Sequence, residues 1–182
     1  MKIRCVNLFF ISAILVFTTN IFSQNSTELK LEKVFVKGCG CSVYLPPYTP
    51  PFDLAYSEDS SQIYTTEYSG DDNYYFGVIA VKLAEPIGDN VQEKELLITR
   101  YLDFIKTLFE IHSSTGYVKG QTLDSKPNVV GVIDSWQDKQ GYKYSVQSWT
   151  DGNKIGVLYI AGPGEYPNQS VRDLFLNGFD FD

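Results

Sequence analysis

Segments rich in β-branched and aromatic residues alternate with tight turns in the second half of this chain. Three such segments follow one another, at residues 129–135, 142–149 and 154–161. The turns between them contain Lys139-Gln140-Gly141 and Asp151-Gly152-Asn153. Strands joined by turns this short pair with their neighbours in antiparallel order. The pattern therefore predicts a three-stranded antiparallel meander.

Residues 62–68 and 74–83 have a similar composition and flank the turn-forming cluster at 69–73, so they predict an antiparallel hairpin. We expect further strands near residues 34–36, 42–45 and 179–181. The proline-rich stretch at 46–51 is better suited to an ordered connection, because proline has no N–H to donate to a sheet ladder.

One amphipathic segment between the hairpin and the meander predicts a long helix. Asn90 is suited to its N-cap, Glu93 follows at the third helical position, and Gly116 is suited to the residue just past its end. A short helix is expected through residues 171–175. These elements predict an α+β fold in a single domain, residues 24–182, with a mainly antiparallel sheet, a long amphipathic helix and a short C-terminal helix.

This element order resembles that of the PsbP-like domains. The ending Phe175-Leu176-Asn177-Gly178-Phe179-Asp180-Phe181 is also similar to the end of those domains, and the resemblance covers roughly residues 40–182. It implies an α/β/α sandwich. It also implies an accessory, assembly or binding role without catalysis, and it carries no functional residue to a position in this chain.

The first 23 residues have the pattern of an export signal. Lys2 and Arg4 precede an apolar segment at residues 8–17, and the small residue Ser23 precedes Gln24. The apolar segment is shorter than the ~20 residues that a membrane-spanning helix needs. We therefore expect a signal peptide at 1–23 and an exported protein in the periplasm, at the cell surface or outside the cell, without a membrane span after cleavage.

The charge of the chain restricts its partners. The full chain has 15 basic and 22 acidic residues and a net charge of −7. Loss of Lys2 and Arg4 with the leader leaves 13 basic residues against 22 acidic ones, a net charge of −9. Such a surface repels phosphate backbones, so we expect no nucleic acid as partner. The expected partner is an unknown protein, an envelope component or a small ligand.

Cys39 and Cys41 flank Gly40 and are the only cysteines after the leader. In an oxidising compartment they are candidates for a local disulfide or a redox pair, because Gly40 lets the backbone curl. Two packed thiols are the alternative. No histidine or further cysteine lies at ligand spacing, so we expect no metal site.

Three other side chains bear on function. His112, the sole histidine, is expected in the last turn of the long helix. Asp134 would share one sheet face with Val132 and Trp136, where burial would raise its pKa. Trp149 is suited to stacking on a sugar ring or an apolar ligand, or to packing beneath a helix. Asp134 and Trp149 thus define a candidate ligand surface.

The sequence contains no catalytic, metal-binding or nucleotide-binding motif specific enough to name an activity. We therefore expect no cofactor and no catalytic residue. The leading interpretation is an exported, non-catalytic binding or accessory domain. The alternative is a thiol-disulfide redox protein that uses Cys39 and Cys41.

Overall fold

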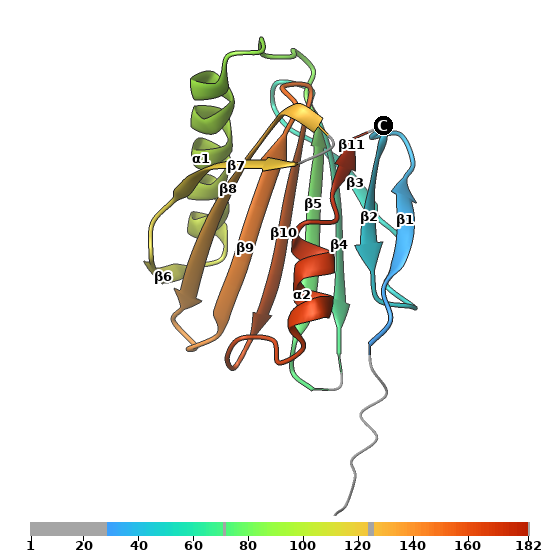
Figure 1. The fold of residues 1–182 in the computed structure, drawn as a ribbon, viewed down its shortest axis with the longest axis vertical. Coiled ribbons are helices and arrows are strands. Elements are labelled where there is room, and N and C mark those ends of the chain that lie inside the picture. The colour runs from blue at the N-terminus through green and yellow to red at the C-terminus, as the bar shows by residue number, and fades with distance from the viewer. Residues whose placement is uncertain (1–28, 71, 124–125, 182) are drawn as a thin grey trace, which may run out of the picture.

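The computed structural model describes residues 29–70, 72–123 and 126–181 (Figure 1). The signal peptide predicted at residues 1–23 lies outside the described residues. None of the helices within the described ranges is both long and apolar enough to cross a membrane.

A large antiparallel sheet forms the centre of the described fold. Along the sheet, the strands follow the order β3 (Asp53–Tyr56), β4 (Gln62–Ser69), β5 (Tyr75–Lys82), β10 (Lys154–Gly162), β9 (Lys143–Thr150), β8 (Lys126–Asp138) and β6 (Ile111–Ser114). A further strand, β7 (Val118–Leu123), pairs with β8 as well, so β6 and β7 share the edge of this long strand. The predicted hairpin, β4–β5, and the predicted meander, β8–β9–β10, are both present.

A small second sheet consists of β1 (Glu32–Val36), β2 (Cys41–Leu45) and β11 (Asp180–Phe181). Together with the helix α2 (Gln169–Leu176), it lies over one face of the large sheet (Figure 1). Val43, Phe175 and Trp149 are buried in the core between these layers. Phe179 packs directly against the backbone of Gly156, where a Cβ atom would come within 2.4 Å of its ring.

The other face of the large sheet carries the helix α1 (Val91–Leu108). Asn90 caps its start by accepting a hydrogen bond from the Glu93 N–H at 3.1 Å. Ile98, Leu102 and Ile105 are buried against the sheet. The main sheet contacts of α1 are with β8, β9 and β6.

The predicted fold class, an α+β domain built as an α/β/α sandwich with a long helix, is wrong. The fold is β-rich, with mostly antiparallel strands and two helices among the described residues. Two physical reasons account for the difference. The first and last strands, β1 and β11, leave the main sheet and both pair with β2 in a second sheet. In addition, α1 ends at Leu108, because Glu110 reverses the chain with a φ of +51° and β6 starts at Ile111.

Candidate functional site

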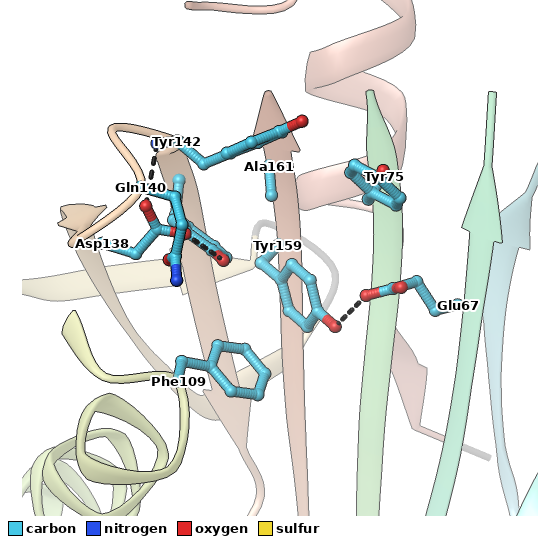
Figure 2. A pocket seen from close by; sticks show the side chains of 9 residues that line it. Glu67, Tyr75, Phe109, Asp138, Gln140, Tyr142, Tyr159 and Ala161 are labelled. Carbon is cyan, nitrogen blue, oxygen red and sulfur yellow. Dashed lines mark hydrogen bonds between the residues drawn. The ribbon is translucent and has the colours of Figure 1, made fainter. Parts of the chain in front are cut away.

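An open cavity of about 450 Å³ lies on the α1 face of the large sheet, beside the end of the helix (Figure 2). Aromatic side chains form most of its wall: Tyr75, Phe109, Tyr142, Tyr144 and Tyr159. Two carboxylates, Glu67 and Asp138, also line it. The size is within the range of about 300–1,000 Å³ that is typical of small-ligand sites.

The register of the strands brings these side chains together. Tyr159 of β10 pairs with Gly77 of β5, which in turn pairs with Glu67 of β4. Two residues further along, Ala161 pairs with Tyr75 on one side and with Tyr144 on the other. Because side chains two residues apart on a strand point to the same face, all of these positions face the cavity.

Tyr159 and Glu67 form the central polar contact of the cavity. The Tyr159 ring extends across β5, and its hydroxyl donates a hydrogen bond to Glu67 Oε2 at 2.6 Å (Figure 2). Only glycine permits this path, because a Cβ atom at position 77 would come within 2.0 Å of the Tyr159 ring. Glu67 of β4 is therefore held at the cavity by Tyr159 of β10, although β5 lies between these two strands.

Asp138 makes the second carboxylate contact at the turn between β8 and β9. It accepts hydrogen bonds from the Tyr142 N–H at 2.9 Å and from the Tyr144 hydroxyl at 3.2 Å. These contacts fix the start of β9 and the orientation of the Tyr144 ring. Figure 2 shows the contact between Asp138 and Tyr142.

The aromatic rings also pack against one another. The ring centroid of Phe109 lies 5.3 Å from that of Tyr159 and 6.0 Å from that of Tyr144. Tyr75 and Tyr142 form a separate pair at 6.0 Å. Such mutual packing limits the rotamers that the rings can adopt, so the wall is formed before any ligand arrives.

The phenols of Tyr144 and Tyr159 stay protonated at neutral pH. Burial, together with nearby Asp138, raises the pKa of Tyr144 to about 12. Burial also raises the pKa of Tyr159 far above its ordinary value, and the hydrogen bond to Glu67 adds to this rise. Both groups therefore act as neutral hydrogen-bond donors to their carboxylates.

Asp134 lies in a different place, beneath α1, and its side chain is fully buried. It accepts hydrogen bonds from the Ser114 hydroxyl at 2.8 Å and from Trp136 Nε1 at 2.7 Å, and Lys106 Nζ lies 3.2 Å away. The sequence led us to expect a raised pKa, and this expectation is wrong. Burial favours a higher pKa of Asp134, but the contacts with Ser114, Trp136 and Lys106 outweigh it, so the pKa is lowered.

Trp149 lies on the opposite face of the large sheet, 1% exposed, in the core under α2. Its Nε1 donates a hydrogen bond to the Leu176 carbonyl at 3.0 Å. Asp134 and Trp149, which the sequence grouped as one candidate ligand surface, therefore do not meet, and neither lines the cavity.

Cys39 and Cys41 lie in and just after the turn between β1 and β2, and both are buried without a disulfide. A hydrogen bond with Cys41 lowers the pKa of the Cys39 thiol, and nearby Lys154 and Lys82 act in the same direction against burial. Gly38 and Gly40, both at positive φ, form the turn. The pair lies with the Val43–Phe175 core, away from the aromatic cavity.

His112 lies in β6 and is exposed, so the prediction that it occupies the last helical turn is wrong. Within the described ranges, no three or more His, Cys, Asp or Glu side chains are grouped so that they could hold a metal ion.

No protein-family model matches this chain, and no curated protein matches it either. The resemblance to PsbP-like domains therefore stays a prediction. The aromatic cavity was missed from the sequence, although several of its residues lie in predicted strands. The available signal was the alternation of tyrosines, with Tyr142 and Tyr144 in one predicted strand and Tyr159 in the next.

Proposed function

We propose that this chain is an exported, non-catalytic binding protein whose ligand occupies the aromatic cavity. The observation that carries the proposal is the convergence of five aromatic side chains and two phenol–carboxylate hydrogen bonds on one open cavity. Pockets with apolar walls and a few fixed polar groups are the usual form of small-ligand sites.

Binding fits these groups better than catalysis does. Tyr144 and Tyr159 are poor bases, because each phenol keeps its proton well above neutral pH. Asp138 is already committed to the Tyr142 N–H and the Tyr144 hydroxyl. These hydrogen bonds thus fix the shape of the cavity wall and the position of its carboxylates, and they leave neither of these two phenols available as a base.

Export is part of the same proposal and has its own test. The leader pattern at residues 1–23 supports it. N-terminal sequencing of the protein from its native host is expected to give Gln24 as the first residue, in material recovered outside the cytosol. An intact Met1 on cytosolic material would contradict export while leaving the cavity proposal unaffected.

The binding proposal is tested by screening a defined compound set with the purified protein. Neutral saccharides, organic acids, amino acids and organic amines are added one at a time, and NMR spectra of protein labelled at Phe and Tyr report which rings respond. We expect at least one class to perturb Phe109, Tyr144 and Tyr159 together. The proposal fails if no class perturbs the cavity rings.

A matched pair of variants locates the binding. Phe109→Ala removes one wall of the cavity and is expected to abolish the response. Phe104→Ala removes an exposed aromatic side chain from α1, five residues earlier, and is expected to leave it unchanged. Equal effects of the two variants would show that the ligand binds elsewhere.

A thiol-disulfide role for Cys39 and Cys41 is the second candidate, supported by the lowered pKa of Cys39. In this reaction the two thiols lose two electrons and two protons to a partner disulfide, which leaves as two thiols. Incubation with oxidised glutathione, followed by thiol counting in denaturant, tests it. The candidate predicts loss of both thiols, and loss should be slower in Lys82→Met, which lacks one of the nearby cations. Thiols that stay reduced and resist alkylation in the native protein would rule it out.

A further inference from the structure

The charge of the cavity wall limits the kind of ligand that it suits. Glu67 and Asp138 contribute two carboxylates, and the described residues that line the cavity include no lysine, arginine or histidine. Lys139, in the turn next to Asp138, forms an ion pair with Glu110 at 3.0 Å and is not part of the wall. A ligand in this cavity therefore experiences negative potential that the wall itself does not neutralise.

The aromatic rings also favour a positively charged ligand. Faces of tyrosine and phenylalanine rings carry negative potential and attract ammonium groups within about 6 Å of the ring centroid. Phe109, Tyr144 and Tyr159 have centroids 5.3–6.0 Å apart, so one small cation can contact more than one ring.

The phenol hydroxyls reinforce this preference. Tyr159 and Tyr144 both direct their hydroxyl hydrogens to the carboxylates, so these donors are already used within the protein. The two phenol–carboxylate pairs therefore offer a ligand only hydrogen-bond acceptors and negative charge. An organic acid would meet repulsion, and a neutral polyol would gain nothing from the charge.

We infer that the aromatic cavity binds a small organic cation, an alkylated or primary ammonium group with an apolar body, between the tyrosine rings and Glu67. This inference rests on the proposed function, because it names the class of ligand for the same cavity. An ion of this class suits a partly open cavity of about 450 Å³.

The test compares a cation with its neutral isostere. Choline carries a quaternary ammonium group, and 3,3-dimethylbutan-1-ol has the same shape with carbon in place of nitrogen. Isothermal titration with the intact mature protein is expected to show choline binding at least about tenfold tighter than the alcohol. The choline affinity is also expected to fall as salt is added, because the attraction is electrostatic and partly exposed.

Two variants separate charge from shape. Glu67→Gln keeps an oxygen that can accept from Tyr159 but removes the charge, so choline binding should weaken about tenfold while binding of the alcohol stays the same. Glu85→Gln removes the same charge from an exposed residue beyond the far end of β5 and serves as the matched control. Thermal unfolding of each variant verifies that it is folded.

The outcomes distinguish this inference from the broader proposal. If choline fails to bind, binds no tighter than the alcohol, or is unaffected by Glu67→Gln, the cation inference is overturned. A neutral saccharide or an organic acid that perturbs the same rings would overturn it too, while leaving the cavity as a ligand site. Only a cavity that responds to no compound class overturns the proposed function.

Discussion

Tyr159 lies flat across Gly77 on the neighbouring strand, and a Cβ atom at that glycine would come within 2.0 Å of Tyr159 Cζ. The glycine is therefore what allows the phenol of β10 to pass over β5 and reach Glu67 on β4. A side chain added at Gly77 would therefore change the cavity, although Gly77 is not one of the residues that line it.

The first prediction concerns Gly77→Ala. The added methyl group has to push the Tyr159 ring away, which breaks the hydrogen bond to Glu67, so we expect a loss of about 1–3 kcal/mol in the free energy of unfolding. Binding at the cavity should be lost as well. Urea titration measures the stability, and Gly88→Ala is the control, because a Cβ atom at Gly88 has no neighbour within 4 Å. Equal stability of the two variants would contradict the close contact.

The second prediction concerns alkaline pH. The pKa of Tyr144 is about 12 in the folded protein against an ordinary value of 10.0. The folded state thus holds this proton more tightly than the unfolded state does. Its stabilising contribution is complete below pH 10 and is lost as the pH rises toward about 12.

Urea titrations at several values of pH measure this loss. Tyr144→Phe should make stability less dependent on pH between about 10 and 12, because the phenol is no longer there to ionise. Tyr48→Phe alters a fully exposed phenol and should leave the dependence as in the parent protein. A Tyr144→Phe profile that runs parallel to the parent profile would argue against the raised pKa.

The third prediction concerns Asp134 and Lys106. Asp134→Asn removes the buried carboxylate 3.2 Å from the Lys106 ammonium and leaves only the more exposed Asp103, at 3.5 Å, as its carboxylate partner. We therefore expect a loss of about 1–3 kcal/mol in the free energy of unfolding. Asp53→Asn removes the same charge from an exposed position in β3 and should change stability by less than about 0.5 kcal/mol.

The contact between Asp134 and Lys106 also predicts how the stability of the protein depends on acidic pH. Because the pKa of Asp134 is lowered in the folded state, its contribution is present above the ordinary value of 3.8 and is lost as the pH falls through the folded pKa. Asp134→Asn should therefore be less sensitive to acid over that range than the parent protein. Equal sensitivity would show that the pair does not control acid unfolding.

The fourth prediction concerns Trp149. Trp149→Phe removes the donor to the Leu176 carbonyl and leaves that buried acceptor unpaired, which should cost about 1–3 kcal/mol in unfolding free energy. Ligand affinity at the cavity should not change, because Trp149 lies on the other face of the sheet. A fall in affinity comparable to that of Phe109→Ala would place Trp149 in the binding site instead.

Local patterns were sufficient to predict several elements. The turn-forming clusters at 69–73 and 151–153 identified the β4–β5 and β9–β10 hairpins, because turns and alternation act over a few residues. Asn90 identified the start of α1 for the same reason. The strands β3, β6 and β7 were missed, since they are short or mostly exposed and depend on partners distant in the chain.

The sequence by itself determined the antiparallel hairpins, the start of the main helix and the acidic character of the chain, since these depend on neighbouring residues or on composition. Tertiary structure alone decided that the first and last strands form a second sheet, and that Glu67 and Tyr159, 92 residues apart, meet over Gly77. The physical reason is that strand order and register are set by packing between distant segments, which no local pattern records.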